Sequence, residues 1–327
     1  MTDTALEARD EVRLEAPARL DPEKFRDPDR TAAGEPRARV AFRELRTLWF
    51  NTGTLCNLTC RNCYIESSPT NDRLVYLTAA EVRGFLDEIA REELPTQEIG
   101  FTGGEPFMNP DLMDMLEDCL GRGFRALVLT NAMKPMRKLE GPLLGLRERY
   151  AGRLSIRVSL DHYTARLHEL ERGPRTFPPT LDGLCWLSAN GFAVAVAGRT
   201  CWGEPEEALR AGYGRLFREH GVPVDASDPV ALTLFPEMDE DADVPEVTEK
   251  CWGILGLDPA GIMCATSRMV VRRKGAKRPA VVACTLIAED PAFEMGATLG
   301  ETARQVKLNH PHCARFCVLG GGSCSRG

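Results

Sequence analysis

The sequence predicts an α/β fold: an open, partial (β/α)6 barrel of the TIM type, followed by a small cysteine-rich domain. Three observations support this prediction. Six apolar, β-branched or aromatic runs alternate with stretches of helical spacing, which is the pattern of a parallel sheet. Six such units are too few to close an eight-stranded barrel. After about residue 250 the alternation stops, and six of the 12 cysteines follow.

The predicted strands are residues 45–51, 98–102, 124–130, 154–160, 192–198 and 230–235. The first predicted helix begins at Thr78, which is followed by Glu81 in the spacing of a capping box. The second covers 109–123, with Pro110 in its first turn and glycines at its end. Further helices are predicted at 136–150, 179–190 and 204–220. In such a barrel, the loops that follow the strands hold the active site.

The chain divides into three predicted parts. Residues 1–44 are charge-dense and proline-rich, which predicts a loose arm or a short surface helix. Residues 45–249 form the barrel, and residues 250–327 form the small domain. Within the small domain, residues 265–283 predict a β-hairpin and residues 298–308 a helix. This domain has little apolar content, so we expect its fold to depend on a metal.

Composition excludes several classes of partner. The 327-residue chain has a net charge of −7, which disfavours binding to nucleic acid or acidic lipid. No apolar run reaches the roughly 18 residues of a membrane span, and the N-terminus lacks the apolar segment of a signal peptide. We therefore expect no membrane partner and a cytoplasmic location. Disulfides are rare in that compartment, so 12 cysteines indicate metal binding.

Three cysteines lie close together directly after the first predicted strand. The stretch TLCNLTCRNCY contains Cys56, Cys60 and Cys63. Structural zinc sites use four protein ligands, and no histidine lies nearby. A cubane [4Fe–4S] cluster held by three thiolates keeps one iron open. An open iron can bind and activate a small molecule, so three cysteines predict a reactive cluster.

This motif and the next one together resemble the radical SAM superfamily. Cys56-x3-Cys60-x2-Cys63 follows the first strand, and Gly103, Gly104, Glu105 and Pro106 follow the second as GGEP. The resemblance implies that the three cysteines hold a [4Fe–4S] cluster. It also implies that the GGEP segment receives the amino group of S-adenosylmethionine (SAM). An ammonium group needs acceptors, and glycines let the backbone approach closely.

The next two strands extend the resemblance. The third ends in LTNAM, which implies that Thr130 and Asn131 face the site. The fourth ends in SLDHYTARLHELERG, which resembles the SxD…RG stretch of sulfatase-maturase and peptide-modifying branches. By that resemblance Ser159 and Asp161 lie near the SAM ribose or the substrate. Arg172 would then be available to a carboxylate as a charged donor.

One position departs from the family pattern. The family carries an aromatic residue before the third cysteine, against the SAM adenine, but this chain has Asn62 there. Tyr64 follows the third cysteine and is expected to substitute for it.

The tail resembles the twitch and SPASM domains of the same superfamily. Cys264 and Cys284 flank the predicted hairpin, and Cys313 and Cys317 follow the predicted helix. The resemblance implies that these four cysteines hold one auxiliary [4Fe–4S] cluster. Cys251 and Cys324 are reserve ligands, because the match to a full SPASM domain is imperfect.

Several alternatives stay open for the tail. Two auxiliary clusters, a zinc site or no metal are each compatible with its sequence. A zinc site gains some support because His310 and His312 adjoin Cys313, although ordinary polar loop residues are the commoner explanation. The remaining cysteines, Cys119, Cys185 and Cys201, are expected to be small buried hydrophobic residues.

The resemblance implies a radical SAM oxidoreductase or maturase. Reductive cleavage of SAM would give a 5′-deoxyadenosyl radical that abstracts hydrogen from a small-molecule or peptide substrate. The auxiliary cluster would assist an oxidation or a radical bond formation, and flavodoxin or ferredoxin would supply electrons. The arm is shorter than the leader-binding domain of peptide maturases, which slightly favours a small molecule or a substrate without a leader. The alternative is a non-catalytic iron–sulfur carrier or scaffold, which would not need the GGEP segment.

Overall fold

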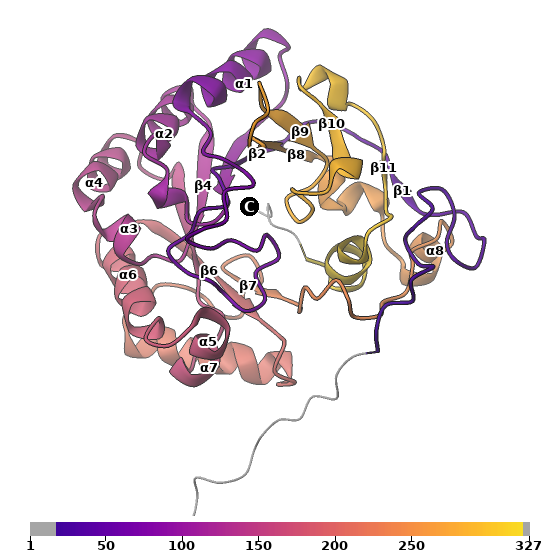
Figure 1. The fold of residues 1–327 in the computed structure, drawn as a ribbon. Coiled ribbons are helices and arrows are strands. Elements are labelled where there is room, and N and C mark those ends of the chain that lie inside the picture. Colours follow the sequence, from indigo (N-terminus) through magenta and orange to yellow (C-terminus); the bar gives the residue numbers. More distant parts are fainter. Residues whose placement is uncertain (1–17, 323–327) are drawn as a thin grey trace, which may run out of the picture.

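The computed structural model describes residues 18–322 and contains one nine-stranded sheet (Figure 1). The strand order is β10-β9-β8-β2-β3-β4-β5-β6-β7, and the strands from β2 to β7 pair in parallel in chain order. The six predicted strands are present, as β2 Thr47–Asn51, β3 Glu98–Thr102, β4 Arg125–Thr130, β5 Leu154–Ser159, β6 Ala193–Arg199 and β7 Leu232–Phe235. The predicted α/β partial barrel is therefore confirmed.

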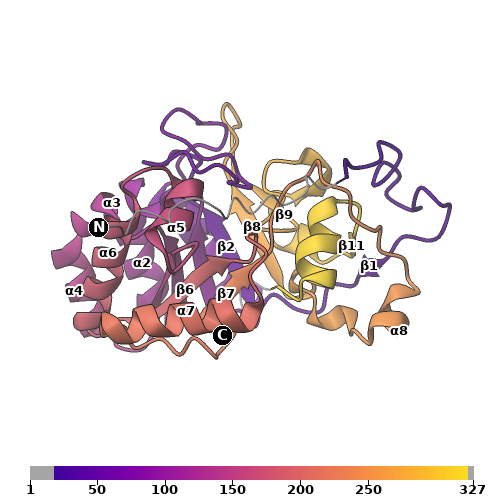
Figure 2. The same cartoon turned by 90° about the horizontal axis from the view of Figure 1, so that it is seen from below.

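Helices cover the outer face of this parallel sheet (Figures 1 and 2). They are α1 Ala79–Arg91, α2 Leu112–Gly121, α3 Lys134–Arg137, α4 Glu140–Arg149, α5 Ala165–Arg172, α6 Phe177–Ala189 and α7 Glu206–Glu219. Because both faces of the strands are covered, their apolar runs are nearly continuous, and β2 is buried along its whole length.

The start of α1 confirms the predicted capping box, whereas α2 starts later than expected. The Thr78 hydroxyl accepts the Glu81 backbone N–H, and the Glu81 carboxylate accepts the Thr78 N–H. Before α2, a 3-10 turn at Pro106–Met108 occupies the chain, and Asn109 accepts the Asp111 N–H. Pro110 therefore precedes the helix instead of lying in its first turn.

The predicted tail hairpin is present, but it belongs to the barrel sheet. β8 Ser267–Val271 and β9 Ala280–Val282 are antiparallel, and β10 Glu294–Gly296 pairs with β9. β8 also pairs in parallel with β2, from Thr47 opposite Ser267 to Phe50 opposite Val270. The parallel sheet thus has seven strands, one more than predicted. The predicted domain boundaries at 44 and 249 stay predictions.

The predicted helix at 298–308 is wrong. The segment forms a 3-10 turn at Gly300–Thr302 and a short strand, β11 Val306–Lys307. β11 pairs with β1 Arg39–Val40, more than 260 residues earlier in the chain. Its helix-like apolar residues, Leu299, Val306 and Leu308, are buried by this arrangement.

The helical turn of the tail lies further on, at Cys313–Leu319, and has π-type hydrogen bonding. Cys313 and Cys317 therefore lie within a helix and do not follow one. Phe316 of this helix stacks on Phe235 at the end of β7, with ring centroids 5.2 Å apart and planes 11° apart. The helix thus lies against β7, the strand at the other edge of the sheet from the hairpin, on the open side of the barrel (Figure 1).

The described part of the N-terminal arm packs on the tail, in contrast to the expected loose arm. Arg37 is 1% exposed and forms a 2.6 Å ion pair with Glu246. Its guanidinium also donates to the carbonyl oxygens of Asp27, Arg30 and Leu308. Residues 1–17 of the arm and Cys324 lie outside the described residues.

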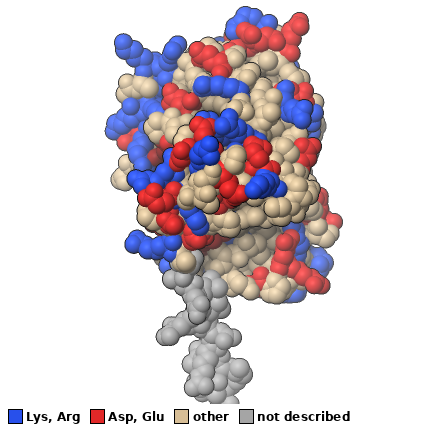
Figure 3. Space-filling model, turned by 90° about the vertical axis from the view of Figure 1, so that its right-hand side faces the viewer, with Lys and Arg blue, Asp and Glu red and all other residues tan. Residues whose placement is uncertain are grey.

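The surface carries charges of both signs. On the face drawn in Figure 3, lysine and arginine side chains are interspersed with aspartate and glutamate. Within residues 18–322, no helix is both long and apolar enough to span a bilayer.

Candidate active site

The three clustered cysteines lie in a long loop after β2, and hydrogen bonds close this loop on itself. The Thr54 hydroxyl donates to the Asn71 carbonyl at 3.0 Å, and the Cys56 N–H donates to the Ser68 carbonyl at 3.0 Å. The loop thereby directs Cys56, Cys60 and Cys63 onto one cavity of about 120 Å³.

Both glycines of the GGEP segment are required by close backbone contact with this loop. A Cβ atom on Gly103 would lie 2.5 Å from the Gly53 carbonyl oxygen, and Gly103 has a φ of +133°. A Cβ on Gly104 would lie 2.2 Å from the carbonyl oxygen of Leu55. The Gly104 N–H instead donates to the Gly53 carbonyl at 2.8 Å, and the Glu105 N–H donates to Leu55 at 3.1 Å. Gly103 and Gly104 line the cysteine cavity as a result.

The Glu105 side chain is buried, 1% exposed, and its carboxylate is hydrogen-bonded to other groups of the protein. Its carboxylate accepts the Thr130 hydroxyl at 2.7 Å, the Asn131 N–H at 2.9 Å and the Phe107 N–H at 3.2 Å. Burial raises the pKa of Glu105 to about 6, although these hydrogen bonds oppose the rise. Glu105 therefore ties the end of β3 to the end of β4. Its role as an acceptor for the SAM ammonium stays a prediction, and so does any role of Pro106, which opens the next turn.

Most of the other predicted residues also line the cysteine cavity. Thr130, Asn131, Ser159, Arg172 and Tyr64 lie on its wall. The structure thus brings residues from the ends of β2, β3, β4 and β5 to one place, as expected for loops at the C-terminal edge of a parallel sheet.

Asn62 points elsewhere. Its side-chain amide donates to both carboxylate oxygens of Glu171, at 3.2 and 3.0 Å, and to Glu237 at 3.1 Å. Among the described residues on the cavity wall, Tyr64 is the aromatic side chain and Asn62 is not included. The contact of Tyr64 with the SAM adenine stays a prediction.

Asp161 and Arg172 form a buried ion pair. Arg172 Nε and Nη2 donate to the two Asp161 oxygens at 2.7 and 3.1 Å, and Arg199 Nε lies 3.6 Å from Asp161 Oδ1. Burial favours a higher pKa for Asp161, but the charges of Arg172 and Arg199 outweigh it and lower that pKa below its usual value. Arg172 thus already has a carboxylate partner within the protein, and it also faces the cysteines.

Two thiols of the loop, Cys56 and Cys60, have a raised pKa in the protein. Burial, with a smaller effect from the negative charge of Glu105, raises the pKa of Cys56 to about 12, although the Leu58 N–H opposes the rise. Burial likewise raises the pKa of Cys60, although Arg172 opposes the rise. Thiols in such surroundings lose their protons when they bind a cationic centre. The donor set therefore fits a metal cluster.

A second cavity of about 100 Å³ adjoins the first and shares Tyr64, Leu129, Ser159, Arg172 and Arg199 with it. Its remaining wall is largely apolar. Phe235, Met238, Leu286 and Phe316 bring residues of β7 and the tail to this wall.

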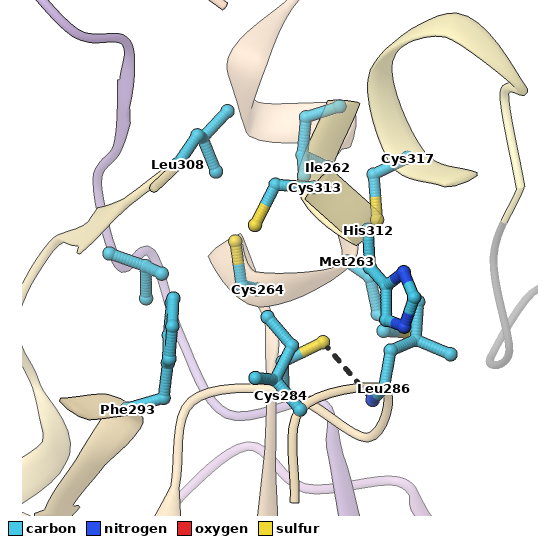
Figure 4. A pocket seen from close by; sticks show the side chains of 12 residues that line it. Ile262, Met263, Cys264, Cys284, Leu286, Phe293, Leu308, His312, Cys313 and Cys317 are labelled. Carbon is cyan, nitrogen blue, oxygen red and sulfur yellow. Dashed lines mark hydrogen bonds between the residues drawn. The ribbon is translucent and has the colours of Figure 1, made fainter. Parts of the chain in front are cut away.

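The four predicted tail cysteines also come together. Cys264, Cys284, Cys313 and Cys317 line one small apolar cavity, which shares Leu286 with the second cavity (Figure 4). Burial and the neighbouring thiols raise the pKa of Cys313 well above its usual value. Cys251, by contrast, lies in α8 Cys251–Leu255, where its sulfur accepts the Thr248 N–H, and it is not among the described residues that line this cavity.

An open cleft of about 880 Å³ lies between the cysteine loop and the tail. Tyr64 lines this cleft as well as both inner cavities. The charged residues of the cleft are mainly acidic. Arg61 and Arg73 line it together with six carboxylates, those of Glu66, Asp239, Glu240, Asp241, Glu289 and Asp290.

Sequence reasoning missed several residues of this region. Arg199 lines both inner cavities and donates to the Asn62 carbonyl at 2.8 Å. It is the last residue of β6, and its position at the carboxyl end of a predicted strand could have identified it as a site residue. Asn57 accepts the Asn131 side-chain N–H at 2.9 Å. Glu171 and Glu237 are brought together only by the fold, and no local pattern marks them.

Known proteins match the part of the chain that contains the cysteine loop. A family model described as the radical SAM superfamily matches residues 50–208. This range includes Cys56, Cys60, Cys63, the GGEP segment and the ends of β4 and β5.

Two curated relatives are similar over about half of the chain. The antilisterial bacteriocin subtilosin biosynthesis protein AlbA of Bacillus subtilis (strain 168) is 32% identical over 143 residues, covering 43% of this chain and 30% of AlbA. The GTP 3′,8-cyclase of Rhodococcus opacus (strain B4) is 35% identical over 186 residues, covering 52% of this chain and 50% of the cyclase. The match thus spans half or less of each relative.

A solved structure shares the fold. Streptococcus suis SuiB bound to S-adenosylmethionine superposes with a TM-score of 0.57 at 11% identity, over 78% of this chain and 64% of SuiB. The predicted resemblance to the radical SAM superfamily and its SPASM/twitch-type branch is confirmed. That family uses a [4Fe–4S] cluster and SAM. Residues 50–208, just under half of the chain, match this family and form a radical SAM domain.

Proposed function

We propose that this chain binds a [4Fe–4S] cluster through Cys56, Cys60 and Cys63 and binds SAM beside it. The observation that carries the proposal is the shared cavity. Three thiols of one loop line it together with Gly103, Gly104, Thr130, Asn131 and Ser159, and no fourth thiol of residues 18–322 does so. One iron of a cubane cluster would therefore lack a protein ligand and be open to SAM.

The residues of the chain would bind and orient SAM. Gly103 and Gly104 are half-buried on the cavity wall, where the absence of side chains would allow close approach of the methionine part. Tyr64 offers an aromatic face, and Ser159 offers a hydroxyl, on the same wall. The bound cofactors supply a radical able to take hydrogen from an unactivated carbon, while the apolar walls keep water away.

The second cavity is the proposed site of the reacting carbon. It adjoins the cysteine cavity and, among residues 18–322, shares Leu286 alone with the tail cysteine cavity. A substrate group held there would lie between the two cysteine sites. This arrangement supports a radical oxidation or bond formation assisted by an auxiliary centre.

Two substrate classes fit this space. About 100 Å³ suits one side chain of a peptide or a small part of a small molecule, and the cleft of about 880 Å³ above it can hold the remainder. AlbA is named for bacteriocin biosynthesis, and SuiB has been solved with its precursor peptide SuiA, whereas the cyclase is named for GTP. The acidic cleft disfavours a polyanion such as a nucleotide, because like charges repel it on approach.

The tail cysteines are the proposed ligands of one auxiliary [4Fe–4S] cluster. Four thiols line a single small cavity, an arrangement that fits four irons. A zinc ion is the second candidate, because four thiolates also form closed zinc sites. An external reductant such as flavodoxin or ferredoxin, and a cytoplasmic location, complete the proposal.

The test is anaerobic reconstitution with iron, sulfide, SAM and a reductant. The wild-type chain should form 5′-deoxyadenosine, and the variant Cys56→Ala/Cys60→Ala/Cys63→Ala should form none and hold about four fewer irons. Cys185→Ala, on α6 and away from the three cavities, is the matched control and should behave as the wild type.

Two outcomes would contradict the proposal. Unchanged 5′-deoxyadenosine formation by the triple variant would refute the proposal that the three cysteines bind the cluster. A wild-type chain that binds the cluster but neither binds nor cleaves SAM would favour the second candidate function, an iron–sulfur carrier or scaffold.

A further inference from the structure

The tail cavity has a fifth donor side chain besides its four thiols. His312 lines this cavity together with Cys264, Cys284, Cys313 and Cys317 (Figure 4). In the figure its ring lies on the side of Cys317, with Cys264 and Cys313 on the other side. A [4Fe–4S] cluster has only four irons, so five donors are one more than it needs.

His312 is buried without a hydrogen bond at its ring. The residue is 0% exposed, and neither Nδ1 nor Nε2 has a hydrogen-bond partner among residues 18–322. Buried polar atoms in proteins are normally satisfied, so an unsatisfied imidazole in a cysteine cavity requires an explanation. A metal ligand role provides one, because a metal would use the lone pair of one ring nitrogen.

The surroundings of His312 match those of metal-bound histidines. Such histidines commonly present their second ring nitrogen to a carboxylate, which fixes the tautomer and the ring orientation. Here Nε2 of His312 lies 3.2 Å from Glu240 Oε1 without forming a hydrogen bond. A small rotation of either side chain would complete that bond. Nδ1 would then carry the free lone pair.

His310 holds this arrangement in place but offers no free nitrogen of the same kind. Its Nδ1 accepts the His312 backbone N–H at 3.1 Å, so the proton of its ring is on Nε2. That nitrogen lies 3.6 Å from Glu240 Oε1. His310 is thus a positioning residue for the turn that leads into Cys313.

We propose that His312, through Nδ1, joins Cys264, Cys284 and Cys313 as the fourth ligand of the auxiliary cluster, and that Cys317 is replaceable. Burial supports the choice, because His312 is 0% exposed and Cys317 is only half-buried. The inference rests on the auxiliary cluster proposed above. An imidazole is neutral where a thiolate is charged, so this ligand set raises the reduction potential of the cluster.

The experiment uses the full chain with Cys56, Cys60 and Cys63 changed to alanine, so that iron reports on the tail alone. After reconstitution and reduction, pulsed EPR should detect hyperfine coupling to one ¹⁴N nucleus, and ¹⁵N-labelled histidine should change that coupling. Adding Cys317→Ser should leave about four irons and the coupling in place. Adding His312→Ala should lower the affinity for the cluster by more than about tenfold, and Glu240→Gln by about 10–100-fold.

Two further variants separate ligation from folding. His312→Cys supplies a thiolate, so it should hold about four irons, lose the nitrogen coupling and shift the midpoint potential to more negative values. His220→Ala is the matched control, because His220 is exposed at the C-terminal end of α7 and does not line the tail cavity; it should keep both the iron and the coupling.

The outcomes distinguish the inference from the function on which it rests. If His312→Ala keeps its iron and an unaltered EPR spectrum, or if Cys317→Ser loses the cluster, the inference is refuted and the four-thiolate cluster stands. If the tail takes up no iron in any variant, the auxiliary cluster itself is refuted, and the inference with it.

Discussion

A single methyl group on Gly104 should displace the cysteine loop. The Cβ of Gly104→Ala would lie 2.2 Å from the Leu55 carbonyl oxygen and 2.6 Å from its carbon. Both contacts are to backbone, so no side chain can move aside. The two segments must separate by about 0.8 Å to reach even a 3.0 Å contact. That shift loosens the hydrogen bonds from Gly104 to Gly53 and from Glu105 to Leu55.

The expected cost follows from these contacts. Overpacking costs about 1–3 kcal/mol, and each weakened hydrogen bond adds up to about 1 kcal/mol. We expect the free energy of unfolding to fall by about 2–4 kcal/mol, with a fall in Tm of roughly 4–8 °C. The displaced loop would also carry Cys56 away from its place in the cavity, so iron uptake at this site should fall.

Chemical denaturation and iron analysis would measure both effects. Gly145→Ala is the matched control, because Gly145 lies inside α4 and a methyl group added to it would meet nothing within 4 Å. That change should stabilise the protein by about 0.5–1 kcal/mol, as expected for alanine in a helix. Equal stability and full iron content in Gly104→Ala and Gly145→Ala would refute the argument from backbone contact.

Two further predictions concern buried carboxylates. Asp161→Asn leaves Arg172 buried without its partner, so the free energy of unfolding at pH 7 should fall by about 3–5 kcal/mol. Because the folded pKa of Asp161 is lowered, its stabilisation is present above the ordinary carboxyl pKa and is lost as the pH falls through the folded value. The difference between wild type and variant should therefore shrink in acid, and an equal difference at pH 3 and pH 7 would contradict this reasoning. The pH dependence of the Glu105 contribution to stability has the opposite sign, because its folded pKa is raised to about 6. The free energy of unfolding of the wild type should therefore fall by about 2 kcal/mol as the pH rises from about 4.5 through 6. Glu105→Gln should remove that slope in denaturation experiments at several pH values, and SAM titration of the same variant should show weaker binding if Glu105 also accepts the ammonium group.

The barrel could be predicted because its signals are local. Residues 98–102 form a strand with the predicted bounds, and the Thr78 capping box is formed as expected. Apolar runs, caps and motif spacing are all visible within a few residues of the sequence. The meeting of the cysteine loop with GGEP and the ends of β4 and β5 then follows from parallel strand order.

The tail could not be predicted in the same way, because its contacts are not local. Residues 298–308 have apolar residues at spacings that suit a helix, but β11 is specified by its partner β1 near the other end of the described chain. Arg37 is charged in a charge-dense segment, and only the fold reveals that it is buried against Glu246. Likewise, the neighbours of Asn62 come from α5 and from the segment after β7, so no stretch of sequence indicates that it turns away from the cysteine cavity.

The pairing of β8 with β2 has a consequence for how the chain is made. A ribosome releases β2 early, but the second neighbour of this strand, residues 267–271, emerges only after most of the chain has been synthesised. Until then one side of β2 presents unpaired backbone groups, the usual starting point for aggregation between strands. During that interval the cysteine loop that follows β2 also lacks the cover of the tail. A barrel expressed without residues 267–271 would keep this side of β2 unpaired, so we expect it to aggregate more readily than the chain that contains β8.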